Sequence, residues 1–300
     1  MAAKNHTSWL ITGGTGFIGQ ALVGVLLERG CHVTVLSRKP AKAAKTLGGK
    51  PTIVASLNDI APDTKLDAVV NLAGEPLFGG LWTQGRKRAF FASRLGTTAA
   101  LISLIERLES KPAVMVSGSA IGFYGTDEEA ELTEDAPSGD DELAGPCRDW
   151  EQAALRVQGY GVRLICLRIG VTLDRSGGML APLAQATKLC LGARLGSGRQ
   201  WLSWISRTDL VRLILFAADN EKLEGPLNGT APAPVRQAEF ADALAAALHR
   251  PRLFWIPGLL LKLLLGDMSV LLLEGQKVVP KKALDAGFSF DAPTIEDALR

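Results

Sequence analysis

Short apolar runs alternate with helical patterns along the first half of the chain. In the helical pattern at 17–29, Ile18, Leu22, Val25 and Leu26 lie on one stripe. Further helices are predicted over 84–108 and 149–157. Strands are predicted at the apolar runs 8–11, 31–36, 52–55, 66–72, 113–117 and 162–169. Strands separated by helices imply right-handed crossovers and a parallel sheet, so we expect an α/β fold with a Rossmann-type, doubly wound sheet.

The regular alternation stops after Gly170. Glycine-rich loops follow at 175–178 and 192–200, and an alanine-rich helix is predicted over 238–248. We therefore expect a first domain over 1–170 and a smaller C-terminal α/β domain over 171–300. Some segments of the second are expected to return to the first sheet.

The segment 253–273 is strongly apolar but is interrupted by Pro257, Gly258, Lys262, Gly266 and Asp267. A membrane-spanning helix needs ~20 residues with few or no charges. A Lys or Asp at mid-span would each cost roughly 3 kcal/mol. We predict no transmembrane segment here but two short helices buried against the protein. The alternative is a peripheral or partner-binding helix.

The overall charge and the cysteine content limit which classes of partner and which cellular location are expected. The net charge of +2 gives no bulk field that would favour nucleic acid or an anionic membrane as a partner. The four cysteines form no CxxC pair, and only three histidines accompany them, so no metal site is expected. Scattered thiols and the lack of an apolar signal sequence favour a cytoplasmic location.

The stretch from Thr12 to Gly19 carries the clearest chemistry. Gly13, Gly16 and Gly19 follow a predicted strand and open a predicted helix. Glycines there allow a pyrophosphate to approach the backbone, and the helix N-terminus supplies free N–H groups. This context predicts a dinucleotide-binding turn.

The end of the second predicted strand indicates which dinucleotide binds. NAD-selective proteins usually carry an acidic residue there, whereas this chain has Ser37, Arg38 and Lys39. A guanidinium suits a 2′-phosphate, so NADP (NADPH) is the expected cofactor. The alternative is that Arg38 and Lys39 are solvated loop charges.

Three motifs resemble those of the extended short-chain dehydrogenases/reductases: Thr12–Gly19, Asn71-Leu72-Ala73-Gly74, and Ser117-Gly118-Ser119 followed by Phe123-Tyr124-Gly125. The stretches Glu75-Pro76, Ser93–Thr98 and Leu273–Pro280 are similar to an atypical, epimerase-family branch with a C-terminal domain of unassigned function. The resemblance covers nearly the whole chain. It implies cofactor contacts at Gly13, Thr15, Gly16, Phe17, Ile18, Ser37, Arg38, Leu72, Ala73, Gly74 and Arg94. It also implies a possible homodimer through two long helices.

The catalytic pair of that superfamily, Tyr-x-x-x-Lys, is missing. Four residues after Tyr124 is Glu128, and four after Tyr160 is Leu164. In the helix that should carry the pair, Cys147 stands in place of the Tyr and Glu151 in place of the Lys. A carboxylate would raise the pKa of a thiol rather than lower it. Ser119 remains the first candidate for catalysis, followed by Cys147 and Tyr124. The alternative for Ser119 is a strand-end serine that satisfies main-chain groups.

Two hypotheses follow. The first is an NADP-dependent oxidoreductase or epimerase acting on an unidentified small carbonyl compound or nucleotide sugar. Loop residues Trp82, Arg86, Lys87, Arg194 and Arg199 are candidates for holding it, or are surface side chains. The second is a catalytically weak NADP-binding regulatory or scaffold protein. Relatives of the branch that this chain resembles are linked by name to cell division, which fits this second hypothesis.

Overall fold

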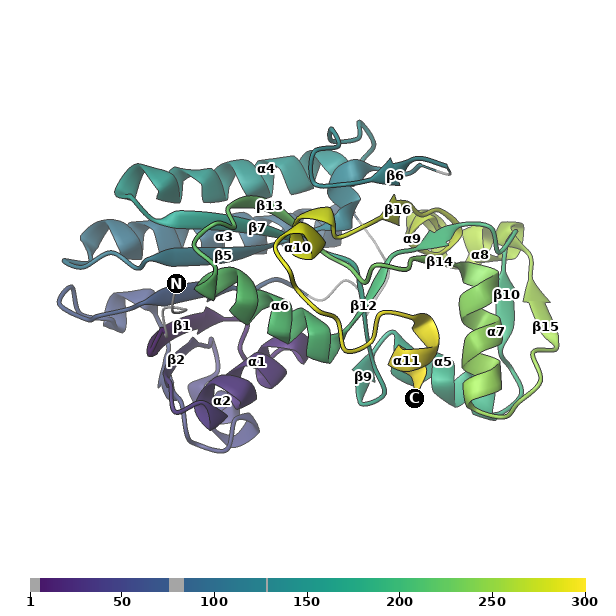
Figure 1. Cartoon of the computed structure of the whole chain (residues 1–300), viewed down its shortest axis with the longest axis horizontal. Helices are drawn as coiled ribbons and strands as arrows, with labels where there is room; N and C mark the ends of the chain where they lie inside the picture. The colour runs from purple at the N-terminus through teal and green to yellow at the C-terminus, as the bar shows by residue number, and fades with distance from the viewer. Residues whose placement is uncertain (1–5, 76–83, 128) are drawn as a thin grey trace.

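A parallel seven-stranded sheet forms the centre of the computed structural model, which describes residues 6–75, 84–127 and 129–300 (Figure 1). All neighbouring strands in it are parallel. In spatial order they are β13 (Gly225–Gly229), β7 (Arg163–Ile169), β5 (Val114–Ala120), β4 (Ala68–Asn71), β1 (Ser8–Thr12), β2 (His32–Leu36) and β3 (Thr52–Val54).

Helices cover both faces of the sheet. Figure 1 shows α1 (Phe17–Glu28) and α6 (Arg207–Asp219) on one side and α4 (Ala144–Leu155) on the other, where α3 (Gln84–Arg107) packs beside it; α2 (Pro40–Thr46) lies near β3. Leu22, Leu26 and Leu210 fill one core, and Leu101, Leu104 and Val157 fill the other. The fold is the expected Rossmann-type α/β architecture.

The strand order reverses between β1 and β4. From β1 the chain continues to β2 and β3 on one side, and it then crosses back to place β4 on the other side of β1. Open α/β sheets bind ligands at such a switch point, in the crevice beyond the carboxyl ends of the strands. The turn after Thr12 and the stretch after Asn71 both lie at this place, since Thr12 and Asn71 are paired in register.

A smaller set of sheets and helices follows. A third core, including Leu173, Trp204, Phe240 and Leu299, holds much of it together. Its strands are β8 (Val171–Asp174), β9 (Gly177–Gly178), β10 (Ala193–Leu195), β11 (Trp201–Leu202), β12 (Trp204–Ser206), β14 (Val235–Arg236), β15 (Phe254–Ile256) and β16 (Lys277–Val278), the last pairing with β6 (Glu131–Leu132). Its helices are α5 (Leu180–Lys188), α7 (Gln237–Ala247), α8 (Gly258–Leu265), α9 (Val270–Leu273), α10 (Lys281–Asp285) and α11 (Ile295–Leu299). Short 3-10 turns occur at Leu57–Asp59, Ile121–Tyr124, Arg156–Tyr160 and Gly266–Ser269.

All six predicted strands are present, and β5 runs on past Ser117 to Ala120. Two later segments, β13 and α6, return to the main sheet. The division at residue 170 remains a prediction. In the described part of the chain, one stretch, Arg88–Arg107 of α3, is long and apolar enough for a membrane span. Three of its side chains, Leu101, Leu104 and Ile105, lie in the core instead.

The prediction for 253–273 was wrong in one respect. Short helices do form there, but four leucines of α8 are exposed and the leucines of α9 are only half-buried. In α8 only Leu261 is buried. Its leucines occupy more than one face of the helix, and a single helix can turn only part of its surface to the protein.

Candidate functional site

The turn after β1 leaves no room for a side chain at Gly13 or Gly19. Gly13 has a φ of +72°, and a Cβ there would lie 2.4 Å from the carbonyl oxygen of Leu72. A Cβ on Gly19 would lie 2.2 Å from the carbonyl oxygen of Gly13. Gly16 is the N-cap of α1 and carries no side-chain cap, so the first N–H groups of that helix face the crevice without a side-chain partner there. The turn therefore has the shape and the free donors that a pyrophosphate requires.

The residues that open α1 meet a hairpin from the smaller part of the molecule. The ring of Phe17 lies against Gly177 and Gly178, where an added Cβ would come within 3.0 Å of it. Arg207 lies over the same ring at 4.9 Å and pairs with Asp174 at 3.0 Å. Thr15 is exposed and Ile18 packs on the core. The glycine-rich loop noted in the sequence thus closes one edge of the crevice.

Arg38 lies beyond the end of β2 with its side chain 88% exposed. Its guanidinium donates to Glu75, 3.2 Å away, which follows β4. The hydroxyl of Ser37 accepts a hydrogen bond from the N–H of Lys39. The guanidinium of Arg38 thus presents exposed N–H donors over the crevice, where the half-exposed carboxylate of Glu75 holds them. These donors are available to an incoming phosphate.

A buried polar chain supports the crevice from below. Thr12 donates to Asn71 at 2.7 Å, Asn71 donates to Thr98 at 3.0 Å, and the indole of Trp150 donates to Thr98 at 3.2 Å. The N–H of Ala73 donates to Thr12. These bonds fix the stretch Leu72–Gly74 against the glycine turn, so the residues that the sequence assigned to the cofactor are brought together here.

Arg94 of α3 reaches the same place. It donates to the carbonyl groups of Phe90 and Glu75, and its guanidinium lies 3.5 Å from the centre of the Phe90 ring. A Cβ on Gly74 would lie 2.6 Å from its Cζ. Burial lowers the pKa of Arg94 to about 10, which leaves it cationic at neutral pH. It can face an anion at the crevice, as a pyrophosphate would require.

Ser119, at the end of β5, belongs to a buried ion-pair network. Its hydroxyl donates to Glu151 of α4 at 2.7 Å. Arg168 of β7 holds the same carboxylate with two bonds, of 2.9 and 3.0 Å, and is only 4% exposed. Burial acts to lower the pKa of Arg168, but its bonds to Glu151 outweigh this and raise it. Glu151 is therefore an acceptor for both neighbours. Arg168 was missed in the sequence; the signal was a cation inside an apolar strand, which is rare without a partner.

The other two catalytic candidates are less free to react. Tyr124 is buried, donates to Asn228 at 2.6 Å and accepts from Arg168 at 2.9 Å. Burial raises its pKa. Burial and the charge of Glu151 raise the pKa of Cys147 to about 12, so this thiol stays protonated at neutral pH. Neither side chain reproduces a tyrosine activated by a lysine.

The stretch Glu274–Val278 has a structural explanation. A Cβ on Gly275 would lie 2.1 Å from the carbonyl oxygen of Trp201. Gln276 is buried and donates to the carbonyl group of Ile121, just after β5. The segment is thus wedged between the end of β5 and β11, and it ties the smaller part of the molecule to the strand that carries Ser119.

The remaining sequence candidates are more scattered. Trp82 lies outside the described residues, as does the side chain of Lys87. Arg199 is exposed, and Arg194 lies 5.8 Å from the ring of Trp255, both in the smaller part. Within 6–75, 84–127 and 129–300, no group of three or more His, Cys, Asp or Glu side chains could hold a metal ion.

Comparison with known proteins agrees with this geometry. The chain matches the family model "NAD dependent epimerase/dehydratase family" over residues 9–228 and "Domain of unknown function (DUF1731)" over 256–300. It is 41% identical to the "Epimerase family protein SDR39U1 homolog, chloroplastic" of Arabidopsis thaliana, over 97% of this chain and 85% of that protein. It is 38% identical to the "Epimerase family protein YfhF" of Bacillus subtilis, over 96% and 95%.

Solved structures show the same architecture. The human epimerase family protein SDR39U1 (isoform 2), crystallised with NADPH, superposes with a TM-score of 0.89 at 34% identity, over 97% of both chains. A nucleoside-diphosphate sugar epimerase from Corynebacterium glutamicum gives a TM-score of 0.78 at 30% identity, over 98% of this chain and 57% of that one. The chain therefore belongs to the NAD-dependent epimerase/dehydratase family and carries the C-terminal domain of unknown function.

Proposed function

We propose that this protein binds NADP(H) and acts as an oxidoreductase or epimerase on the hydroxyl or carbonyl group of a small molecule, such as a nucleotide sugar. The glycine turn and Arg94 would face the pyrophosphate, and Arg38 would leave Glu75 to bind the 2′-phosphate. The relative crystallised with NADPH supports this choice of cofactor. When bound, the nicotinamide supplies a hydride donor or acceptor.

The observation that carries the proposed chemistry is the direction of the Ser119 hydrogen bond. The Ser119 proton already points to Glu151, a carboxylate that accepts from Ser119 and twice from Arg168. A substrate hydroxyl that donates to Ser119 Oγ would have a path for its proton through Ser119 to Glu151. The network is thus arranged to accept a proton, which suits oxidation of an alcohol, the step with which an epimerase also begins.

A specific observation favours a second candidate, an NADPH-binding regulatory protein with little turnover. Neither Cys147, with its pKa near 12, nor Tyr124, with both hydrogen-bonding positions of its hydroxyl used, offers an active proton donor. Glu151 carries the opposite charge to the lysine that normally activates the tyrosine.

Turnover separates the two candidates. The purified protein would be incubated with NADP⁺ and a panel of alcohols and nucleotide sugars, and with NADPH and carbonyl compounds, while absorbance of the reduced nicotinamide is followed. We expect turnover with hydroxyl substrates that Ser119→Ala abolishes. Ser117→Ala is the matched control, because Ser117 lies on the same strand and its buried Oγ has no hydrogen-bond partner among the described residues.

Each result has a defined meaning. Tight NADPH binding without turnover on any class would reject the enzyme and support the regulatory protein. Turnover that survives Ser119→Ala would reject the proton path. Failure to bind NADPH would reject both candidates.

A further inference from the structure

The end of the molecule farthest from the main sheet carries an unusual number of exposed apolar side chains. In α8, Leu259 and Leu263 are each 81% exposed, Leu264 is 64% exposed and Leu260 is 44% exposed. Fully burying a leucine is worth about 1.5–3 kcal/mol. Burying the four exposed leucines of this eight-residue helix against another surface would therefore release a large hydrophobic free energy that the isolated chain does not gain.

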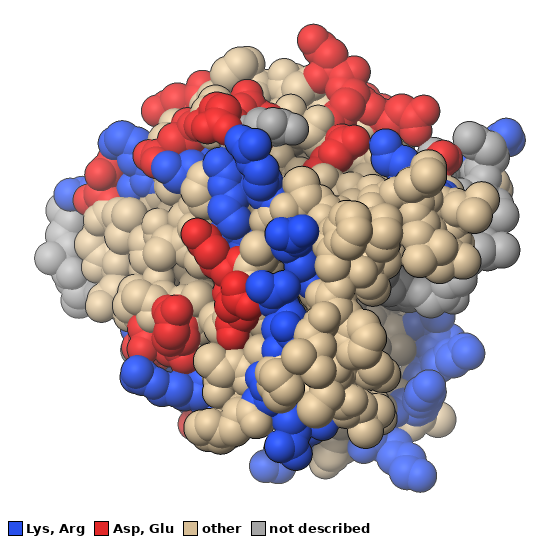
Figure 2. Space-filling model, turned by 90° about the vertical axis from the view of Figure 1, so that its right-hand side faces the viewer, with Lys and Arg blue, Asp and Glu red and all other residues tan. Residues whose placement is uncertain are grey.

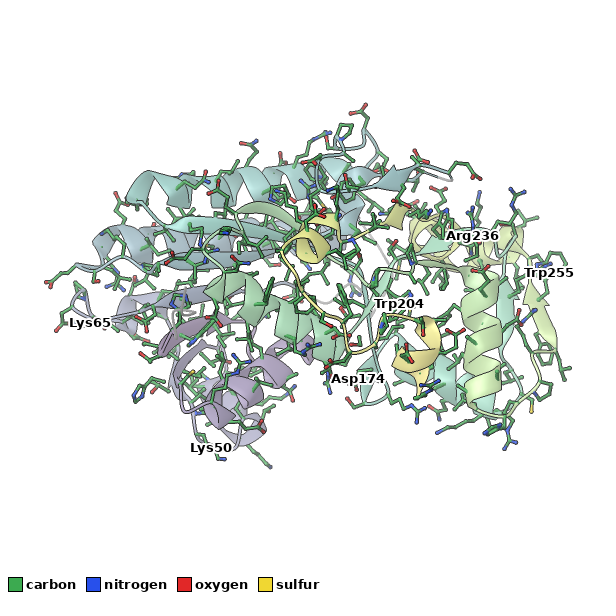
Figure 3. All side chains as sticks on the ribbon, in the orientation of Figure 1. Lys50, Lys65, Asp174, Trp204, Arg236 and Trp255 are labelled. Atoms are coloured by element: carbon green, nitrogen blue, oxygen red, sulfur yellow. The ribbon has the colours of Figure 1, made fainter. Side chains whose placement is uncertain are left out.

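The strand before this helix extends the same surface. Leu253, Phe254 and Trp255 are 69%, 47% and 57% exposed, and β15 pairs with β10 at this end (Figures 1 and 3). Of the large apolar side chains that are exposed in the described ranges, only Leu155 and Leu284 lie outside 189–264. We call the seven residues Leu253, Phe254, Trp255, Leu259, Leu260, Leu263 and Leu264 the apolar end.

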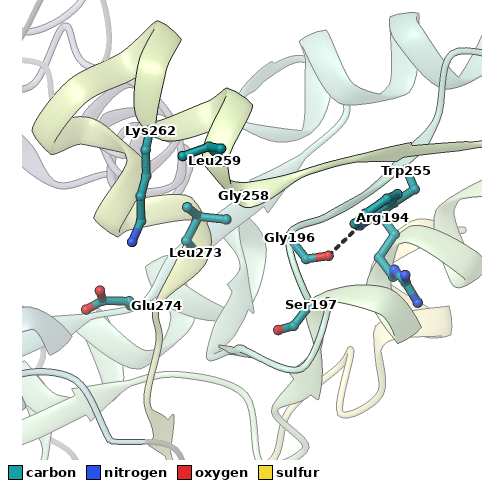
Figure 4. A pocket seen from close by; sticks show the side chains of 9 residues that line it. All are labelled: Arg194, Gly196, Ser197, Trp255, Gly258, Leu259, Lys262, Leu273 and Glu274. Atoms are coloured by element: carbon teal, nitrogen blue, oxygen red, sulfur yellow. Dashed lines mark hydrogen bonds between the residues drawn. The ribbon is translucent and has the colours of Figure 1, made fainter.

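Basic side chains accompany the apolar end. Residues 188–199 and 250–274 contain six Lys or Arg side chains and two acidic ones, Asp267 and Glu274, in a chain whose net charge is only +2. Lys188, Arg199, Arg250 and Lys262 are exposed. Figure 2, which faces this end, shows a band of Lys and Arg with a broad uncharged area on one side and Asp and Glu side chains on the other. Figure 4 shows Lys262 beside Leu259 and Leu273 at the edge of a groove of about 520 Å³.

This combination identifies the surface that would cover the apolar end. Helices that lie in a membrane interface combine Leu, Phe and Trp on one side with Lys and Arg beside them. Eight residues are too few to cross a bilayer, which needs about 20. A two-fold contact between copies centred on α8 would bring each Lys262 towards its own counterpart, whereas anionic headgroups would neutralise these cations. We propose that the apolar end docks the protein peripherally on a bilayer of anionic lipid.

The test is co-sedimentation of the full chain with vesicles. We expect binding to vesicles of equal parts phosphatidylglycerol and phosphatidylcholine, and much weaker binding to phosphatidylcholine alone. Leu259→Ser and Leu263→Ser should each weaken partition about tenfold. Lys262→Glu should weaken it at least about fivefold, less so at high salt, because about 1 kcal/mol is gained per basic residue at such a surface.

Leu284→Ser is the matched control, since Leu284 is 46% exposed on α10, outside the apolar end; it should bind like the wild type. Unchanged melting temperatures would show that the variants fold. Three results would overturn the proposal. The first is no binding to either vesicle, or equal binding to both. The second is binding of the double variant Leu259→Ser/Leu263→Ser that equals binding of the wild type. The third is a dimer without lipid that this double variant turns into a monomer, which would assign the surface to a second copy.

Discussion

Removing the carboxylate of Glu151 should be among the most damaging single changes in the protein. The guanidinium of Arg168 lies inside a central strand and is 4% exposed. Glu151 supplies its only counter-charge within salt-bridge distance among the described residues, through bonds of 2.9 and 3.0 Å. In Glu151→Ala the guanidinium keeps its contact with the Phe123 ring, 3.5 Å from the ring centre, but its remaining hydrogen bonds are those with the Tyr124 hydroxyl and, at 3.4 Å, the carbonyl group of Glu134.

The size of the loss can be bounded. Breaking a buried ion pair by removing one partner costs about 3–5 kcal/mol, because the other charge stays buried and unpaired. Folding stability is typically only about 5–15 kcal/mol, so Glu151→Ala would remove a large part of it. Replacing both partners with apolar residues is often neutral, so Glu151→Leu with Arg168→Met should recover most of the loss.

Urea unfolding followed by circular dichroism would measure both effects. The matched control is Glu131→Ala, which breaks an ion pair with Lys277 of 2.9 Å whose side chains are 54% and 30% exposed; exposed pairs contribute at most about 1 kcal/mol. A Glu151→Ala variant that lost no more stability than Glu131→Ala, or a double variant no more stable than Glu151→Ala, would contradict this role of the buried ion pair.

Three further predictions concern the cofactor turn and the thiols. Arg38→Ala should weaken NADPH binding about tenfold or more while leaving NADH binding nearly unchanged, measured by fluorescence titration, and an equal loss for both cofactors would contradict the 2′-phosphate contact. Gly13→Ala should abolish NADPH binding and destabilise the fold, whereas Gly24→Ala should stabilise it by about 0.5–1 kcal/mol, because no atom lies within 4 Å of a Cβ at Gly24. Burial raises the pKa of Cys147 and of Cys166 from 9.0 to about 12. The unfolded chain therefore loses these protons at lower pH, and the free energy of unfolding should fall between pH 9 and 12, more steeply than in Cys147→Ala/Cys166→Ala; parallel curves would exclude this cause.

The main sheet could be predicted from the sequence because its strands are buried on both faces and read as continuous apolar runs. The turn at Gly13, Gly16 and Gly19 was equally visible, since steric limits exclude a side chain at Gly13 and Gly19. β13 was not visible: its residues, Gly-Pro-Leu-Asn-Gly, carry little strand preference, and pairing with β7 alone makes them a strand.

The site could be predicted only in part. The assignment of Cys147 and Glu151 to the positions of the Tyr–Lys pair rests on the order of motifs along the chain and remains a prediction. The ion pair of Glu151 with Arg168 joins residues from a helix and a strand, and the contact of Arg38 with Glu75 joins two loops. Such pairs depend on side-chain directions in three dimensions, which periodicity does not give. The exposed leucines of α8 differ from the prediction for the same reason, because helical spacing does not say whether a partner element exists.

The position of β13 has a consequence for synthesis. The chain completes β7 at Ile169, leaves the sheet for β8 to β12, and returns only at Gly225. Until then β7 is an open edge with unpaired main-chain groups, and such edges recruit other strands. A nascent or truncated chain that ends near residue 170 would therefore be prone to aggregation. Successful expression would require the later segment that pairs with this edge, although it follows most of the residues predicted to bind the cofactor by more than a hundred positions in the chain.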